Sequence, residues 1–207
     1  MRVSYPKFKE ELGPFLCFSL HDAKKHFPGF DRKRLTEWQQ KGYVQKIVRG
    51  HYVFNDVKKD FAFWWLVANC IYSPSYVSLQ SALYYYDFIP EAVFQVTSIT
   101  TKRTRKLEAL QKRFLYRNCK PACYFGYTLI PFSQGHHIRV AEPEKAILDL
   151  LYLEPSIGNQ EDFEAWRFNR QVIEETINCS LMEQYAKLMN NQLFYDRFMK
   201  FKKWLHA

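Results

Sequence analysis

Four side chains within one short segment carry the chemical groups that proteins use to read DNA bases. They are Arg32, Lys33, Thr36 and Gln39. Arginine can bind guanine through two hydrogen bonds, glutamine can bind adenine in the same way, and lysine and threonine contact phosphates or the thymine methyl group. On a helix that enters the major groove, this set predicts DNA binding. On an ordinary amphipathic surface helix, the same side chains would only be solvated.

These four residues need a helix to present them, and flanking residues mark where that helix begins and ends. The Asp31 carboxylate is a good N-cap, because it can accept hydrogen bonds from the free N–H groups of the first turn. Phe30 and Leu35 have the spacing of a hydrophobic staple, and Gly42 stands where a helix ends in a left-handed residue. Leu35 and Trp38 share one face, so the four polar side chains point elsewhere.

A short basic hairpin is expected directly after this helix. Residues 43–48 and 51–54 are rich in β-branched and aromatic side chains, and they flank a tight turn at Arg49-Gly50. A wing of this kind would lie beside the helix on DNA. The side chains expected to reach the DNA backbone or the minor groove are Lys46, Arg49 and His51.

Two further helices are expected before the capped helix. Residues 7–12 favour the first of them. The segment Ser19-Leu-His-Asp22 matches the capping-box pattern and opens the second, which runs to about His26. Residues 27–29, Phe-Pro-Gly, are typical of a turn. Helix, turn, capped helix and hairpin together predict a winged helix-turn-helix DNA-binding domain over residues 1–57.

The net charge of +9 is concentrated in two segments. Residues 1–60 carry 13 basic and 7 acidic side chains, and residues 101–120 carry 8 basic and 1 acidic. Such islands on an otherwise nearly neutral chain favour a polyanionic partner. The second island follows an expected strand, where its side chains either contact phosphate or form a solvated loop beside an apolar strand. The members expected to extend the DNA footprint are Lys102, Arg103, Arg105 and Lys106.

Residues 58–207 are expected to form a mixed α/β domain with a mainly antiparallel sheet and a helical C-terminal tail. The chain as a whole is then an α+β protein. Segments of alternating, β-branched residues predict strands, and apolar side chains at helical spacing predict helices. Ser78 is expected to cap one helix. The expected strands are 93–100, 114–117, 124–130 and 137–140, and the expected helices are 61–71, 79–86, 144–153 and most of the chain after about residue 162.

Two metal-centred alternatives have less support than DNA binding. A zinc site could use two cysteines and two histidines, but no second cysteine pair accompanies them. A metal-dependent nuclease could use carboxylates and a lysine, but the helix dipole explains acids in a first turn. We therefore expect no metal, no cofactor and no enzymatic activity. The zinc candidates are Cys119, Cys123, His136 and His137, and the nuclease candidates are Glu142, Glu144, Lys145 and Asp149.

The remaining composition indicates a cytoplasmic protein. The five cysteines are odd in number and scattered, as is typical of reduced thiols. Charged residues interrupt the N-terminus, so it has no apolar signal core. The longest apolar run, 61–71, is too short to span a membrane.

Four segments together resemble the AbiEi family, the antitoxins of bacterial type IV toxin–antitoxin and phage-abortive-infection loci. They are the wing Lys46-Ile-Val-Arg-Gly-His-Tyr, the helix Tyr76-Val-Ser-Leu-Gln-Ser-Ala-Leu, the strand Val96-Thr-Ser-Ile-Thr-Thr-Lys-Arg, and Ala141-Glu-Pro-Glu-Lys-Ala-Ile-Leu-Asp-Leu-Leu. Gly126 fits the same pattern. The resemblance covers roughly residues 15–153.

This resemblance implies a winged helix that represses its own operon by binding inverted repeats in double-stranded DNA, an arrangement on which two copies could associate. It also implies a C-terminal domain that counteracts a co-encoded nucleotidyltransferase toxin, in general without a stable complex between the two proteins. It assigns no catalytic residues. The main rival interpretation is a winged-helix transcription factor with no toxin to oppose.

Overall fold

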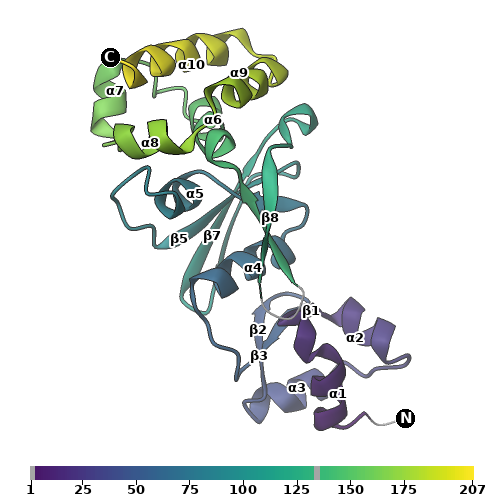
Figure 1. Ribbon diagram of the computed structural model, residues 1–207. Coiled ribbons are helices and arrows are strands. Elements are labelled where there is room, and N and C mark those ends of the chain that lie inside the picture. The colour runs from purple at the N-terminus through teal and green to yellow at the C-terminus, as the bar shows by residue number, and fades with distance from the viewer. Residues whose placement is uncertain (1–2, 133–135) are drawn as a thin grey trace.

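The chain folds into a small N-terminal unit and a larger unit that contains a six-stranded sheet (Figure 1). The structure is a computed structural model and describes residues 3–132 and 136–207. Helices and strands alternate irregularly, and the C-terminal part is entirely helical. The protein is therefore of the mixed α+β class, as the sequence predicts.

In the N-terminal unit, three helices pack on a small antiparallel sheet whose strand order is β1-β3-β2. The capping box of the second helix is present: the Ser19 hydroxyl accepts from the Asp22 N–H, and the Asp22 carboxylate accepts from the Ser19 N–H. The elements are α1 (Tyr5–Leu12), η1 (Gly13–Phe15), β1 (Cys17–Ser19), α2 (Leu20–His26), α3 (Lys33–Gln40), β2 (Val44–Val48) and β3 (His51–Phe54).

Aromatic side chains dominate the core of this unit. Phe8 of α1 is fully buried and lies within 6.2 Å, between ring centroids, of Phe18, Phe27, Phe30, Trp38 and Phe54. Each such ring removes a large apolar area from water. The core therefore fixes α3 against α1 and the sheet.

The small sheet has two buried faces. On β1, Phe18 belongs to the aromatic core, whereas its neighbour Cys17 packs into the core of the larger unit. On β3, Tyr52 and Val53 divide in the same way. This follows from the strand geometry, because successive side chains point to opposite faces. The small sheet therefore lies between the two cores and contributes one face to each.

The larger sheet has the strand order β6-β7-β5-β4-β9-β8. Three of its neighbouring pairs are antiparallel, and two, β5–β7 and β4–β9, are parallel. The sheet is therefore mixed but mainly antiparallel, as the sequence predicts. Its strands are β4 (Ser75–Val77), β5 (Gln95–Thr100), β6 (Arg105–Ala109), β7 (Lys112–Asn118), β8 (Tyr127–Pro131) and β9 (His137–Ala141).

Helices cover both faces of this sheet. The Tyr116 hydroxyl on β7 donates to the Ala68 carbonyl of α4, 2.8 Å away, while Thr97 on β5 exchanges hydrogen bonds with Ser81 of α5. Tyr116 is paired with Ser98, the residue after Thr97, so α4 and α5 lie on opposite faces. The helices of this unit are α4 (Phe61–Ile71), α5 (Gln80–Tyr85), α6 (Pro143–Leu153), α7 (Gln160–Ala165), α8 (Arg170–Thr176), α9 (Cys179–Leu188) and α10 (Gln192–Leu205), with the short η2 (Pro121–Cys123).

The C-terminal helices pack on α6 and on one another at the end of the molecule far from α3 (Figure 1). The aromatic face of α10 is buried, with Phe194, Phe198 and Phe201 each at most 1% exposed. This face therefore packs on the larger unit. Within the described residues, no helix combines the length and apolarity that crossing a bilayer requires.

Two local expectations were wrong. Ser78 does not cap α5, because its hydroxyl lies 2.7 Å from a carboxylate oxygen of Asp149 and Leu79 occupies the cap position. The strand expected from Tyr124 begins only at Tyr127, because η2 and the left-handed Gly126 (φ +68°) precede it.

Candidate nucleic-acid interface

The exposed face of α3 carries polar side chains at helical spacing. Arg32, Lys33 and Thr36 are all exposed, while Leu35 and Trp38 on the opposite face are buried. Figure 1 places α3 at the outer end of the N-terminal unit, away from the large sheet. The Asp31 carboxylate accepts from the Lys33 N–H at 2.9 Å, but the cap position of α3 is Arg32, so Asp31 lies one residue before the place expected of it. This face can therefore approach a flat or grooved partner without obstruction from the larger unit.

Gln39 does not lie free on the exposed face as expected, and the exposed glutamine of α3 is Gln40. The Gln39 side-chain amide donates to the Leu35 carbonyl of its own helix at 3.1 Å, and Gln39 is only partly exposed. Gln40 is exposed and lies four residues beyond Thr36, which places the two on one stripe. Spacing from Thr36 could have identified Gln40 as the better candidate.

Arg34 is the basic residue on α3 that faces the protein. Its guanidinium lies 5.1 Å from the centre of the Trp38 ring and donates to the Val3 carbonyl at 3.1 Å. It also pairs with Glu37. These contacts attach the N-terminal segment to α3 and leave Arg34 unsuited to reading bases.

On the hairpin, the Lys46 and Arg49 side chains are exposed as expected. The His51 side chain is less exposed than these two. The His51 ring is partly buried, and burial lowers its pKa from the ordinary value. The ring is therefore neutral at neutral pH and brings no charge to a phosphate. The turn itself is fixed, because the Leu20 N–H at the start of α2 donates to the Gly50 carbonyl at 3.0 Å.

The second basic island lies in the larger unit and not beside α3. Lys102 and Arg103 occupy the turn between β5 and β6, and Arg105 and Lys106 begin the edge strand β6. All four are exposed. The Tyr72 ring supports the turn: Lys102 and Arg105 each lie 5.5 Å from its centre, and its hydroxyl donates to the Arg103 carbonyl at 2.9 Å.

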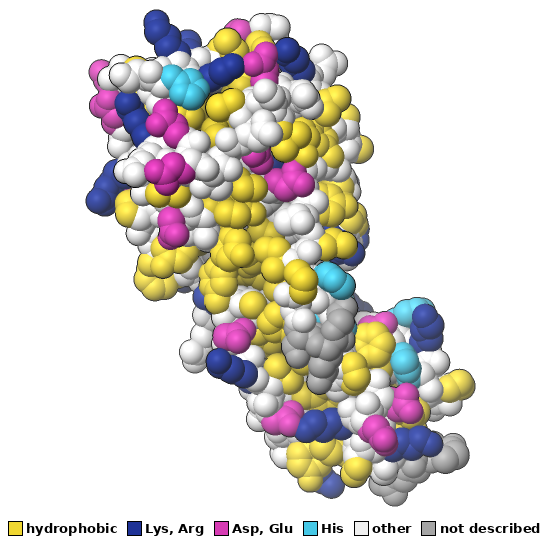
Figure 2. All heavy atoms as spheres, viewed as in Figure 1, with side chains coloured by type: hydrophobic (Ala, Val, Ile, Leu, Met, Phe, Trp, Pro, Cys, Tyr) yellow, Lys and Arg dark blue, Asp and Glu magenta, His cyan; other side chains and the backbone are white. Residues whose placement is uncertain are grey.

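The positive charge does not form one continuous surface in the view of Figure 2. Lys and Arg side chains appear on both units, and a broad band of hydrophobic side chains lies between them on this face.

The nuclease candidates are occupied by protein partners. Lys145 pairs with Asp149, and both are buried, at 0% and 1% exposure. Asp149 also accepts from the hydroxyls of Tyr76 and Ser78 at 2.9 and 2.7 Å. The neighbouring Glu144 carboxylate also has a partner within the protein, because it accepts a hydrogen bond from the Asn178 N–H at 2.7 Å. This constellation ties α6 to β4 and α9 and leaves no open carboxylate pair.

The zinc candidates do not converge. The His136 ring is hydrogen-bonded to the Pro14 carbonyl of the N-terminal unit, while the Cys123 thiol faces the Met189 carbonyl at 3.9 Å. Within residues 3–132 and 136–207, no three His, Cys, Asp or Glu side chains come together as a metal site would require.

Comparisons with known proteins concern the fold alone. No protein-family model and no curated protein matches this chain. Among solved structures, the chain is similar to the crystal structure of RV2827C protein from Mycobacterium tuberculosis, with a TM-score of 0.53. The two sequences are 12% identical, and the similarity covers 95% of this chain and 76% of that chain. This likeness extends across both units.

Proposed function

We propose that the protein is a DNA-binding transcriptional regulator whose N-terminal unit is a winged helix. The observation that carries this proposal is the exposed polar stripe of α3, formed by Arg32, Lys33, Thr36 and Gln40. The order of elements supports it, because a helix, a strand, two helices and a hairpin precede the larger unit. In helix-turn-helix proteins, the second helix of the motif lies in the major groove and reads bases near its N-terminus.

In this arrangement, each exposed side chain has a role that its chemistry supports. Arg32 is placed to bind guanine with two hydrogen bonds, and Thr36 and Gln40 contact the next bases along the groove. Lys33, Lys46 and Arg49 bind phosphates and set the position of the protein on the duplex. His51 contributes only as a neutral hydrogen-bonding group.

We further propose, from the resemblance to AbiEi antitoxins, that the protein represses its own operon and opposes a co-encoded nucleotidyltransferase toxin. The larger unit would carry the antitoxin activity, since α3 and the hairpin account only for DNA binding. The competing proposal is a transcription factor without a toxin.

The DNA-binding proposal is tested by titrating the protein onto its own promoter at two salt concentrations. We expect salt-dependent binding that is lost in the double variant Arg32→Ala/Lys33→Ala. Lys200→Ala/Lys203→Ala is the matched control, because it removes the same charge from exposed positions on α10. Equal loss of binding in both variants would mean that only net charge matters and that α3 is not the reading helix.

The antitoxin proposal is tested by co-expression with a neighbouring nucleotidyltransferase gene. We expect the wild-type protein to restore growth. The Arg32→Ala/Lys33→Ala variant should restore it equally well from a constitutive promoter, because the proposed activity resides in the other unit. A protein that binds the promoter but restores no growth would be a transcription factor alone.

A further inference from the structure

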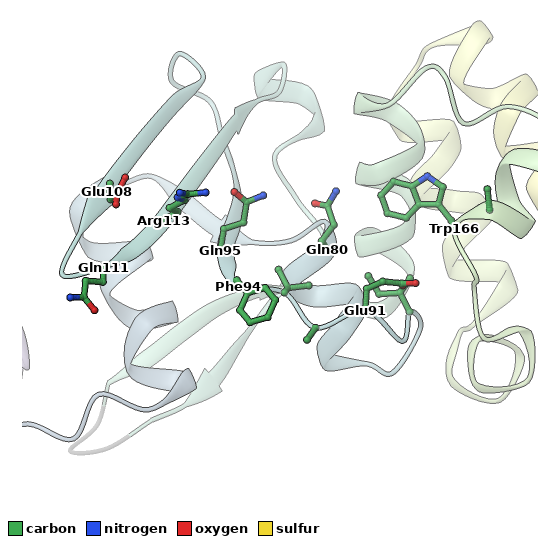
Figure 3. Close-up of a pocket in the computed structure, with 12 residues that line it drawn as sticks. Gln80, Glu91, Phe94, Gln95, Glu108, Gln111, Arg113 and Trp166 are labelled. Carbon is green, nitrogen blue, oxygen red and sulfur yellow. The ribbon is translucent and has the colours of Figure 1, made fainter.

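A groove in the larger unit lies between the large sheet and the C-terminal helices, and it plays no part in the proposed reading of double-stranded DNA. Its volume is about 920 Å³, enough for a molecule the size of a nucleotide. Figure 3 shows Glu108, Arg113, Gln95 and Gln80 in a row along one side, with Trp166 at the end nearest the helices.

The strand register explains this row. Arg113 on β7 is paired with Glu108 on β6 and with Gln95 on β5, so the three side chains share one face of the sheet. Gln80, the first residue of α5, continues the row. The result is a line of hydrogen-bonding groups that includes two amides, each able to donate and accept.

The charges of the groove are balanced within the protein. Glu108 lies opposite Arg113 across the ladder, and Glu91 pairs with Arg167 at 3.3 Å. A neutral groove with several amides does not select for a strongly charged ligand. It suits a polar, planar group such as a nucleobase, whose edge carries both donors and acceptors.

Two aromatic rings border the groove. Phe94 is 85% exposed, the most exposed of the protein's large hydrophobic side chains within the described residues. Trp166 lines the other side and stacks on Phe168 at 6.1 Å. Exposed aromatic rings are the platforms on which single-stranded nucleic acids stack their bases.

One member of the basic island, Lys106, faces this groove. Lys106 lies two residues before Glu108 on β6, so its side chain is on the same face of the sheet. Arg105, one residue before Lys106, points to the opposite face, where it and Lys102 lie against the Tyr72 ring. A basic side chain beside an aromatic groove suits a nucleic acid, whose phosphates are anionic and whose bases stack on aromatic rings.

We propose that this groove binds single-stranded nucleic acid, with a base stacked on Phe94 and its edge bound by Gln80 and Gln95. The phosphate chain runs along β6 over Lys106 toward the basic turn. This site is separate from α3 and does not depend on α3 reading double-stranded DNA. A protein segment is the alternative occupant, but the basic side chains of Lys106 and Arg113 on the groove's own face favour phosphate.

The test measures binding of fluorescein-labelled single-stranded RNA and DNA of mixed sequence, about ten nucleotides long, a length within the range of known single-strand sites. We expect Phe94→Ala to weaken binding roughly 5- to 150-fold, the range that corresponds to loss of one base–aromatic stack. Leu129→Ala is the matched control, because Leu129 is an exposed apolar residue (54%) on the opposite edge strand β8. Lys106→Ala should reduce the salt dependence of the same binding.

The outcome also separates this site from the DNA-reading helix. Arg32→Ala/Lys33→Ala should leave single-strand binding intact, and Phe94→Ala should leave promoter binding intact. If Phe94→Ala and Leu129→Ala bind the oligonucleotides as tightly as the wild type, the proposal is wrong. It is equally wrong if Phe94→Ala leaves oligonucleotide binding unchanged but weakens binding to the neighbouring nucleotidyltransferase, because the groove would then be a protein docking site.

Discussion

Helices α3 and α6 both carry several ionic side chains, yet they use them in opposite ways. On α3, Arg32 and Lys33 are exposed at the outer end of the molecule. On α6, Lys145 and Asp149 are fully enclosed and paired with each other. An exposed charge costs the fold little and is free to bind a partner, whereas a buried charge must be satisfied internally. The exposed charges of α3 are therefore available to a partner, whereas the buried charges of α6 hold the fold together.

The largest effect that tests this difference is expected at Asp149. Replacement by alanine leaves Lys145 charged and unpaired in the core and removes the acceptor of the Tyr76 and Ser78 hydroxyls. We expect Asp149→Ala to lower the free energy of unfolding by about 3–5 kcal/mol. Denaturant unfolding measures this, with the exposed Asp196→Ala as control. Similar stability in the two variants would show that the buried pair is not structural.

A smaller loss is expected at Gly126, beside the same pair. Gly126 has a φ of +68°, and a Cβ there would lie 3.0 Å from Cγ of Lys145 and from the Tyr185 ring. We expect Gly126→Ala to destabilise the fold by about 1–3 kcal/mol through strain and overpacking. Gly42→Ala separates the two causes, because Gly42 also has a positive φ (+71°) but has open space around it. If both variants lose the same stability, crowding against Lys145 contributes nothing.

On α3, the expected effect concerns binding and not stability. Arg32→Ala should cost about 1–3 kcal/mol at one base pair of the operator and relax the preference there. Arg49→Ala should weaken all sequences alike and reduce the salt slope by about one. Competition between operator variants measures the first, and a salt titration measures the second. If Arg32→Ala unfolds like the wild type, its charge does not contribute to stability, unlike the buried charges of α6. A loss of stability in Arg32→Ala would contradict this distinction.

The smallest effect is expected at a surface ion pair between α9 and α10. Hydrogen bonds from Lys202 and Lys187 lower the pKa of Glu183 from an ordinary 4.5 to about 2. A lowered pKa means that these pairs stabilise the fold above pH 4.5, and that the stabilisation is lost as the pH falls through about 2. The Tm of Glu183→Gln should lie slightly below that of the wild type at neutral pH, and the gap should close in acid. A gap that is constant with pH would point to packing and not charge.

Local signals in the sequence predicted much of the N-terminal unit. The Ser19 capping box and the left-handed Gly42 are short-range features, and each occurs where it was expected, while the cap of α3 lies one residue after the expected Asp31. The short strands β1 and β4 were missed, because three residues are too few to show alternation. The edge strand β6 was missed because its charged residues indicated a loop.

The sites of the larger unit depended on long-range contacts, which the sequence does not display. Lys145 and Asp149 are four residues apart, a spacing typical of exposed helix pairs, and only the tertiary structure shows that they are buried. The groove is built from α5, β5, β6, β7 and α7, which are separated along the chain. Likewise, only the structure shows that Gln39 bonds to its own helix.

The shared small sheet has a consequence for how the protein unfolds. Phe18 and Tyr52 pack in the aromatic core of the N-terminal unit, and their neighbours Cys17 and Val53 pack in the core of the larger unit. If either unit unfolded alone, apolar side chains in the core of the other unit would become exposed to water. We therefore expect a single cooperative unfolding transition for the whole chain. A fragment ending at residue 57 would expose the Cys17 and Val53 face to water and would aggregate more readily than the intact protein.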